Sequence, residues 1–248
     1  MYATARRPES IADLEADGCR TLQLDVNDDA SMTAAVRAVE AAHGAVGALV
    51  NNAGYGQEGA FEDTSMDEVR RQFETNVFGL VRMCQLVLPK MREQRSGRIV
   101  NVSSVGGKVT FPGGAFYHAT KHAVEALSDV LRFEVAGFGI KVSIVEPGLI
   151  KTAFGDTATA SIAASSVYSD FNAAVAKRVE GAYEGLMGRM AAGPESVAKA
   201  IEHAVASRRP RTRYRVTAGA RVVLTSRKLL PDRAYDLMMR TQFPQPKA

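Results

Sequence analysis

A tyrosine and a lysine, Tyr117 and Lys121, stand four residues apart in a segment whose apolar residues recur at the helical period. Residues at positions i and i+4 lie on one face of a helix, so both side chains can reach the same ligand. A phenol beside a lysine can donate or accept a proton, which is general acid–base chemistry. Such a pair also arises by chance, and the alternative is a half-buried tyrosine beside a solvated lysine.

Three further polar segments are placed to join this pair. The residues at 51–54, Asn-Asn-Ala-Gly, end a buried apolar run, Asn76 lies within a long helical segment, and Ser104 ends the next run. Because the carboxyl ends of parallel strands meet at one edge of a sheet, we expect these groups to gather there. Two alternatives stay open: the two asparagines make only a turn, or Ser103 is the inward-facing hydroxyl, since alternate strand residues face opposite ways.

The elements that must position these residues alternate along the chain. Short β-branched runs are expected as strands at Tyr2–Ala5, Thr21–Val26, Ala48–Asn51, Arg98–Val102 and Lys141–Val145. Segments of helical period lie between them at Ala30–Ala42, Met66–Arg95 and Phe116–Phe138, and helices resume at Asn172–Met190 and Pro194–Ser207. Parallel neighbours need crossover connections, which are usually helices. The pattern predicts one α/β domain over 1–248, with a doubly wound parallel sheet.

Local signals mark where some of these elements begin and end. Ser65 followed three residues later by Glu68 predicts a capping box, and Gly44 and Gly139 stand where helices end. Beyond Pro147 the pattern loosens into a stretch rich in Ala, Ser and Thr. We therefore expect residues 152–193 to cover a substrate as a lid, the alternative being a long loop without that role.

Taken together and in order, five elements resemble the short-chain dehydrogenase/reductase family, and among its members the NADP-preferring 17-beta-hydroxysteroid and retinol dehydrogenase-like enzymes. They are N-N-A-G at 51–54, Asn76, Ser104, the Y-x-x-x-K of Tyr117 and Lys121, and the segment Pro147–Thr152. The resemblance covers about Tyr2 to Thr152 and, more loosely, the remainder. It implies a Rossmann-like fold and an NAD(P)-dependent oxidoreductase.

The resemblance also implies the roles of four catalytic residues. Tyr117 would donate a proton to a carbonyl or accept one from an alcohol while hydride passes to or from the nicotinamide. An ordinary phenol has a pKa near 10, and bringing it to about 7 needs roughly 4 kcal/mol, which Lys121 and the positive nicotinamide would supply. Ser104 would hold the substrate oxygen, and Asn76 would order a water that links Lys121 to solvent.

For the cofactor, the resemblance implies contacts from three parts of the chain. Asp25 and Val26 would meet the adenine, and Arg6 matches the 2′-phosphate of NADP; NAD is possible, and the alternative is a surface arginine pair with Arg7. The remaining expected cofactor contacts are Asn51, Ala53, Gly54, Tyr117, Lys121, Pro147, Gly148, Ile150 and Thr152.

The sequence departs from the family at its start, where the first strand, glycine-rich turn and helix are expected. Nothing before Tyr2 resembles that unit, and no T-G-x-x-x-G-x-G occurs. In the strand order 3-2-1-4-5-6 the first strand is central, so its absence would leave two neighbours unpaired. We expect the natural protein to start upstream, with Met1 a misplaced start within the second strand. If the chain is complete, a non-catalytic binding or scaffold protein is the alternative.

Composition excludes several other classes. The 248 residues are 46% hydrophobic and 23% charged, with a net charge of +4, and no apolar run reaches the roughly 20 residues of a membrane span. Two cysteines suit a reducing cytoplasm. The late arginines Arg211, Arg213 and Arg215 alternate with Tyr214 and Val216, which favours a solvated strand face over a nucleic-acid partner. His118 and His122 lack metal-ligand neighbours, so no metal site is expected.

Substrate and partners are expected only in outline. The resemblance implies a small hydrophobic alcohol or ketone and a homo-oligomer formed through the helices Met66–Arg95 and Phe116–Phe138. The run Val222–Phe243 is expected as a lid or core helix, the alternative being a surface that docks on a membrane or subunit. Residues that could line a pocket, or simply pack the core, are Phe154, Val167, Tyr168, Phe171, Tyr183, Leu186, Met187 and Met190.

Overall fold

The strands that the structure describes all pair in parallel. The computed structural model describes the chain except residues 153, 160–161, 163–165, 185–187 and 246–248. One two-stranded sheet contains β1 (Tyr2–Ala5) and β2 (Arg20–Gln23). A four-stranded sheet has the order β3 (Ala48–Asn51), β4 (Gly97–Val102), β5 (Ile140–Glu146) and β6 (Arg213–Arg215).

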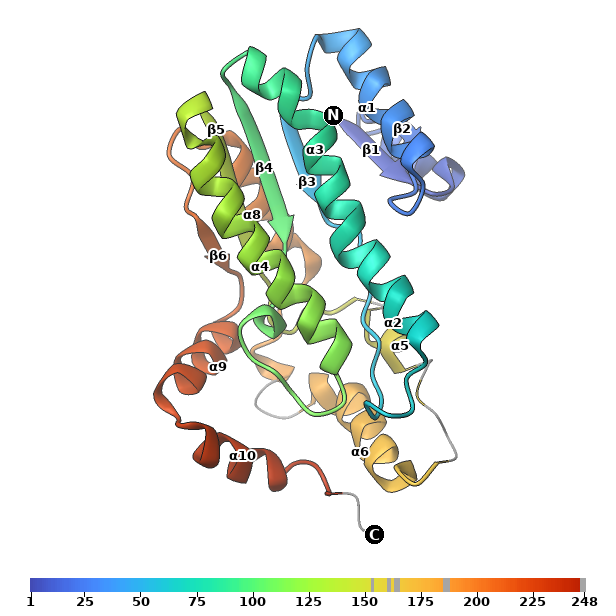
Figure 1. Ribbon diagram of the computed structural model, residues 1–248, viewed down its shortest axis with the longest axis vertical. Helices are drawn as coiled ribbons and strands as arrows, with labels where there is room; N and C mark the ends of the chain where they lie inside the picture. Colours follow the sequence, from blue (N-terminus) through green and yellow to red (C-terminus); the bar gives the residue numbers. More distant parts are fainter. Residues whose placement is uncertain (153, 160–161, 163–165, 185–187, 246–248) are drawn as a thin grey trace.

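Long helices cover both faces of the four-stranded sheet. In Figure 1, α3 (Gly79–Glu93) and α4 (Ala115–Val135) run side by side in front of it, and α8 (Pro194–Ala206) packs behind β4 and β5. The connections between parallel strands are therefore helical crossovers, with α1 (Asp29–His43) between β2 and β3. The predicted α/β class is confirmed.

The strand register brings the carboxyl ends of β3, β4 and β5 to one edge of the four-stranded sheet. Asn51 at the end of β3 lies opposite Asn101 of β4, and Val102 lies opposite Val145 of β5. Below this edge in Figure 1 gather the shorter helices, which are α2 (Met66–Phe73), α5 (Phe154–Thr159), α6 (Ser169–Glu180), α9 (Ala218–Leu229) and α10 (Asp232–Arg240). The described 3₁₀ segments are η1 (Pro8–Glu15), which is kinked at Ile11, and the three-residue η3 (Val105–Gly107), η4 (Ala136–Phe138) and η5 (Gly181–Tyr183). Among the described residues, no helix combines the length and apolar character that a bilayer crossing requires.

Three apolar clusters hold these layers together. The largest fills the space between β3–β5 and the helices α1, α3 and α4. A second packs α8 against the opposite face of the sheet. The third joins Val109 and Val175 to Tyr235, Met239 and Phe243, and the Tyr235 hydroxyl donates to the Thr110 carbonyl at 2.5 Å. The C-terminal run is thus packed on the protein, as a lid or core helix would be.

Helix boundaries follow the local signals. Ser65 and Glu68 form both bonds of the capping box at the start of α2 (Met66–Phe73). Gly44 and Gly139 end their helices with φ of +81° and +75°, which glycine adopts without a Cβ clash. The long helix expected from Met66 is interrupted by one π-helical turn, η2 (Glu74–Phe78), before α3.

Two regions differ from the expected pattern. The stretch expected to be irregular after Thr152 contains α5, and α6, in the region expected as one helix over Asn172–Met190, ends at Glu180 and is followed by η5. No ladder joins β1 to β3 within the described part of the chain, so the strands form two sheets rather than one. The absence of a first strand and helix stays a prediction.

Candidate active site

The centre of the site is the phenol of Tyr117, in the first turn of α4. Its side chain is 9% exposed, and it forms a hydrogen bond with Ser104. Burial raises the pKa of Tyr117 to about 12, partly offset by the Ser104 bond and increased by the nearby Glu58 carboxylate. The protein groups alone therefore hold this phenol protonated, instead of bringing its pKa toward 7.

Lys121 lies one helical turn further along and is equally buried. Its Nζ donates to the Val102 carbonyl at 2.9 Å and stands 5.9 Å from the centre of the Tyr117 ring. Burial lowers the pKa of Lys121 to about 8. An ammonium group has three N–H donors, so donors remain after the bond to Val102. Lys121 can thus gain or lose a proton near neutral pH, and it keeps N–H donors for a ligand.

The two serines at the end of β4 have different environments. Ser104 Oγ accepts from the Gly106 N–H at 3.0 Å and bonds Tyr117. Ser103 is buried, and its Oγ has no hydrogen-bond partner among the described residues. A Cβ on Gly107 would stand 2.6 Å from that oxygen, so only glycine fits there. The geometry thus joins Ser104, and not Ser103, to the tyrosine.

Asn76 is held in the π-helical turn and is 1% exposed. Its Nδ2 donates to the Tyr55 carbonyl at 2.9 Å and to Thr120 Oγ1 at 3.1 Å, while its Oδ1 accepts from the Tyr55 N–H at 3.1 Å. Single π-turns are often found at functional sites. Here the amide fixes the segment after β3 against α4; the water-ordering role stays a prediction.

The residues after β3 pass directly over this cluster. The Asn51 side chain points inward, donating to Asn101 Oδ1 at 2.9 Å, so only its backbone is available to a ligand. Ala53 and Gly54 are exposed. A Cβ on Gly54 would stand 3.1 Å from Asn76 Oδ1 and 3.6 Å from Lys121 Nζ. The backbone therefore approaches the lysine closely because residue 54 is glycine.

The predicted adenine and phosphate contacts lie on the two-stranded sheet and its connections. The Asp25 carboxylate accepts from the Asn27 N–H at 2.9 Å, and the Val26 carbonyl packs where a Cβ on Gly79 would stand. Arg6 is exposed just beyond β1, and its carbonyl accepts from the Gln23 amide at 3.4 Å. The roles of Asp25, Val26 and Arg6 in holding a cofactor stay predictions.

The segment after β5 borders the site from the other side. The Pro147 carbonyl accepts from Val105 N–H at 2.9 Å, which ties it to the turn beyond Ser104. A Cβ on Gly148 would overlap Thr217 Oγ1. Ile150 pairs with Ala192 in an isolated parallel bridge, and Thr152 is exposed. The expected cofactor contacts here are therefore positioned by backbone bonds.

The expected lid packs beside the phenol through α5. The rings of Phe154 and Tyr117 lie 5.4 Å apart, and the Glu58 N–H donates to the Ala158 carbonyl at 3.1 Å. Val167, in contrast, is 84% exposed. Leu186 and Met187, also expected near a pocket, lie outside the described residues. Among the described pocket residues, Phe154 has a ring contact with Tyr117.

Sequence reasoning missed Glu58 and a buried ionic cluster. Glu58 stands between Gly56 and Gly59 in the segment over the site, a placement of an acid between glycines that could have drawn attention. Glu146 ends β5 and is almost fully buried, and it meets Arg213 at 3.1 Å and Arg215 at 3.4 Å.

The same arginine, Arg213, meets Glu125 of α4 at 3.0 Å and Asp129 at 2.6 Å, and Lys108 also meets Glu125 at 3.0 Å. The Arg213 side chain is 24% exposed. The prediction of a solvated strand face for the late arginines is thus wrong for Arg213, because its charge is needed to pair buried carboxylates.

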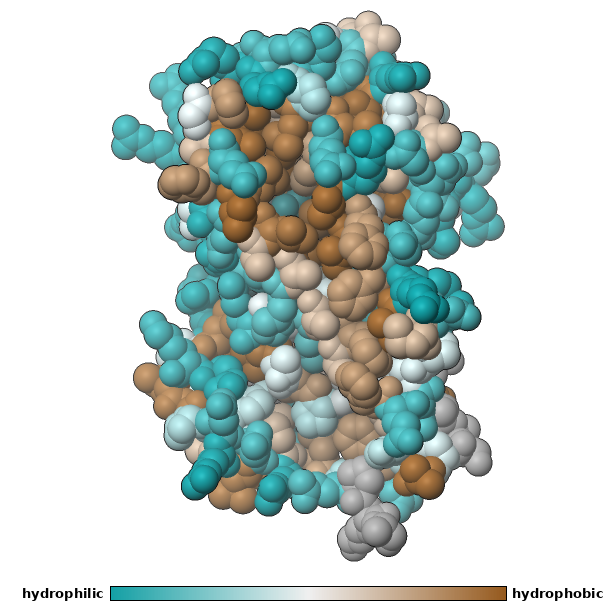
Figure 2. Space-filling view, viewed as in Figure 1, coloured by the Kyte–Doolittle hydropathy of each residue, from teal (hydrophilic) through white to brown (hydrophobic). Residues whose placement is uncertain are grey.

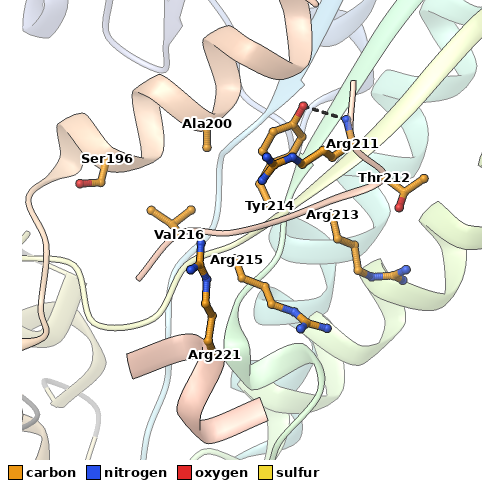
Figure 3. Close-up of a pocket in the computed structure, with 9 residues that line it drawn as sticks. All are labelled: Ser196, Ala200, Arg211, Thr212, Arg213, Tyr214, Arg215, Val216 and Arg221. Carbon is orange, nitrogen blue, oxygen red and sulfur yellow. Dashed lines mark hydrogen bonds between the residues drawn. The ribbon is translucent and has the colours of Figure 1, made fainter. Parts of the chain in front are cut away.

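An arginine-rich depression lies beside this cluster, away from the phenol. Figure 3 shows Arg211, Arg215 and Arg221 around Tyr214, whose hydroxyl accepts from the Arg211 N–H at 3.0 Å. The depression has a volume of about 500 Å³, and none of the residues lining it is an expected site residue. The chemistry-bearing cluster and this depression are separate features.

Comparison with known proteins agrees with this arrangement. Residues 2–163 match the family model of short chain dehydrogenases. The chain is 34% identical over 240 residues to the oxidoreductase YbbO of Escherichia coli K12, covering 96% of this chain and 84% of that protein.

Two solved structures are similar over most of their length. A short-chain dehydrogenase from Streptomyces avermitilis is 37% identical, with a TM-score of 0.77 over 97% of this chain and 86% of that one. The closed form of a serine dehydrogenase complexed with NADP⁺ is 28% identical, with a TM-score of 0.73 over 87% and 84%. With a doubly wound fold and a family match over more than half of its length, this chain belongs to the short-chain dehydrogenase/reductase family of oxidoreductases.

Proposed function

We propose that the protein transfers a hydride between NADP(H) and the carbonyl or secondary alcohol of a hydrophobic small molecule, with Tyr117 as the acid–base group. The observation that carries the proposal is the grouping of Tyr117, Ser104 and Lys121 beneath the Gly54 backbone. A phenol hydrogen-bonded to a serine, with a partly used ammonium nearby, suits proton transfer to a substrate oxygen.

The residues present fit a nicotinamide nucleotide. Lys121 retains N–H donors that ribose hydroxyls can accept, and the missing side chain at Gly54 leaves room beside it. Arg6, exposed beyond β1, would pair with a 2′-phosphate, which favours NADP over NAD. NADP bound to the similar serine dehydrogenase supports the same choice. The other residues proposed to contact the nucleotide are Asp25, Val26, the backbone of residues 51–54 and Pro147–Thr152.

The chain's own residues would divide the proton chemistry between them. The nicotinamide, when bound, supplies the hydride or accepts it. Ser104 donates to the substrate oxygen and aligns it with the phenol, and Tyr117 protonates that oxygen during reduction. Lys121, whose pKa is lowered to about 8 by burial, can return a proton to the phenol near neutral pH. Asn76 fixes the Tyr55 backbone, so that the wall of the site keeps its shape.

Residues 152–193 are proposed to cover the substrate. Besides the Phe154–Tyr117 contact, the Asn172 amide spans to the segment over the site, donating to Asp63 Oδ2 at 2.8 Å and accepting from the Ala60 N–H at 2.9 Å. An aromatic ring beside the phenol favours an apolar substrate and excludes water from the proton donor.

A homo-oligomer is proposed through the face of α3 and α4. Figure 2 shows a band of apolar side chains along this face, and on α4 it includes Leu127, Val130 and Phe133, the last 87% exposed. Exposed apolar patches of this kind mark association surfaces. Light scattering of Phe133→Asp is expected to give a smaller assembly than the wild-type protein, and an unchanged mass would contradict the proposal.

The function is tested by nucleotide binding followed by turnover. Calorimetry on the full-length protein is expected to show binding of NADPH, more tightly than NADH. A panel of aliphatic and aromatic ketones is then screened for NADPH consumption, with Tyr117→Phe as the matched control. A wild-type protein that binds neither nucleotide, or a Tyr117→Phe variant as active as the wild type, would contradict the proposal.

A further inference from the structure

Glu58 has a position that the proposed chemistry leaves unexplained. It lies on the segment that runs from the end of β3 across Lys121, Asn76 and α5. Its Oε2 stands 3.0 Å from the point that a Cβ on Gly114 would occupy, and His118 Nε2 stands 2.7 Å from that point. Glu58 also affects the ionisation of Tyr117 through its charge. The carboxyl group therefore lies beside the proton donor, at the start of α4.

The carboxyl group has no protein partner there. Within the residues that the structure describes, no hydrogen bond or ion pair reaches it, and burial alone raises the pKa of Glu58 to about 7. Its backbone N–H is bonded to Ala158, so the segment itself is held in place. The Glu58 side chain is half-buried, and its oxygens are not among the fully buried atoms that lack a partner, so water reaches them. An acid with a raised pKa beside a proton donor is typical of a place where a ligand binds.

The neighbouring side chains form their hydrogen bonds elsewhere. His118 Nδ1 donates to the Gly106 carbonyl at 3.2 Å, and burial lowers the pKa of this imidazole to about 4. A neutral ring with its proton on Nδ1 has only a lone pair at Nε2, so it cannot donate to Glu58. Lys121 keeps donors after its bond to Val102, but no hydrogen bond or ion pair joins it to Glu58 among the described residues. The carboxyl group of Glu58 can therefore take a donor from a ligand in the site.

We propose that Glu58 is a substrate-binding residue, whose carboxyl group accepts a hydrogen bond from a hydroxyl or ammonium group that the substrate carries near its reacting carbon. The inference rests on the proposed function and narrows its substrate class to amino or hydroxy ketones and the corresponding alcohols. The surroundings are otherwise apolar on the α5 side, where Phe154 and Ala158 lie. A site with one such acceptor discriminates strongly against analogues that lack the donor.

The experiment compares three ketones of equal chain length in the NADPH-dependent assay with the full-length protein: 2-heptanone, 1-hydroxy-2-heptanone and 1-amino-2-heptanone. The readout is the ratio of kcat/KM for each donor-carrying ketone to that for 2-heptanone. The variants are Glu58→Gln, which keeps the shape but not the charge, and Glu58→Leu. Glu134→Gln makes the same chemical change on the exposed side of α4 and serves as the control.

In the wild-type protein we expect at least one donor-carrying ketone to be preferred. Glu58→Leu is expected to lower that preference about 10- to 100-fold, mainly through KM, as for loss of a hydrogen bond to a charged group. Glu58→Gln is expected to lower it strongly for the ammonium ketone and less for the hydroxy ketone. The ketone whose preference falls in the variants shows whether the site binds a hydroxyl or an ammonium group.

Two other outcomes are distinguishable. If the wild type reduces 2-heptanone and both Glu58 variants keep its ratios, the inference is overturned while the proposed function stands. A Glu58→Leu variant that slows all three ketones equally also overturns it, since Glu58 then acts through Tyr117 rather than on the substrate. If the wild type reduces none of the three, the substrate class is wrong, and absence of nucleotide binding in the same sample would remove the proposed function as well.

Discussion

Two groups of ionisable side chains lie on or beside helix α4, and they differ in how their charges are paired. Near its first turns, Tyr117 and Lys121 lie with Glu58 in a cluster that contains no ion pair within the described residues. One to three turns further along, Glu125 and Asp129 are paired with Arg213 at distances of 3.0 and 2.6 Å. The two groups share one helix and one side of the sheet.

The pKa values of the two groups show which interactions act on them. In the first cluster burial dominates, raising the pKa values of Tyr117 and Glu58 and lowering that of Lys121, so all three move toward their neutral forms. In the second cluster burial also raises the pKa of Glu146, which Arg213 and Arg215 partly offset, whereas Arg213 and Arg132 hold the pKa of the Asp129 carboxyl below its usual range despite desolvation. Unpaired groups remain available to a ligand, whereas paired ones tie α4 to β5 and β6. We therefore assign chemistry to the first cluster and stability to the second.

The largest effect is expected from Tyr117→Phe. Loss of the proton donor should lower kcat/KM about 1000-fold in any ketone assay that the wild type supports, because general acid catalysis contributes on that order. The thermal midpoint should stay near that of the wild type, since only one hydroxyl is removed. Steady-state kinetics and circular dichroism on the same sample check this, and loss of folding with loss of activity would contradict the assignment.

Arg213→Met is expected to act on stability. It leaves Glu125 and Glu146 buried without their shared cation, and breaking a buried pair from one side costs about 3 kcal/mol. Urea unfolding measures the loss, with the exposed Arg221→Met as the matched control. A loss of unfolding free energy for Arg213→Met no larger than for the control would mean that the ionic cluster does not stabilise the fold.

The two serines of β4 provide a sharper test within the first cluster. Ser104→Ala removes the hydroxyl that bonds Tyr117, and we expect kcat/KM to fall about 100-fold. Ser103→Ala removes a buried hydroxyl that has no partner among the described residues, so activity should be retained and stability should be equal or higher. The reversed pattern would assign the substrate contact to Ser103.

Glu58→Gln gives the smallest of these effects, and it depends on pH. The folded-state pKa of Glu58 is about 7, above the usual 4.5, so the folded protein binds more protons between these values. The contribution of Glu58 to stability therefore falls as pH rises from about 4.5 to 7 and stays low above that. The variant should match the wild type near pH 4 and exceed it by about 2 kcal/mol at pH 8.

Urea unfolding at the two pH values checks this prediction. Glu134→Gln, an exposed change on α4, should show no such dependence. Equal stabilities of wild type and Glu58→Gln at both pH values would mean that Glu58 is not held in an unfavourable charged state.

Much of the fold could be predicted because its signals are local. The capping box of Ser65 and Glu68, the glycine ends at Gly44 and Gly139, and the apolar strands each depend on neighbouring residues. The meeting of Ser104, Tyr117 and Lys121 followed from strand direction and helical spacing. Among the described residues β1 and β3 do not pair, so the strands form two sheets. That a first strand and helix are missing stays a prediction.

The remainder depends on contacts between segments far apart in the sequence. Nothing near Glu58 indicates that its carboxyl group will lie beside Gly114 and Tyr117, and nothing near Arg213 indicates two buried carboxylates on α4 and β5. The pKa that the protein groups alone give Tyr117, about 12, also depends on burial in the fold. Burial and pairing are properties of the folded chain, so sequence patterns do not report them.

The most direct test of the division between the two clusters is the NADPH-linked turnover rate of Arg213→Met, measured beside Tyr117→Phe at a temperature where circular dichroism shows both variants folded. The account predicts that Arg213→Met keeps a rate within a few-fold of the wild type, whereas Tyr117→Phe loses nearly all of its activity. A folded Arg213→Met that is as inactive as Tyr117→Phe would contradict the account, since the paired charges would then belong to the chemistry.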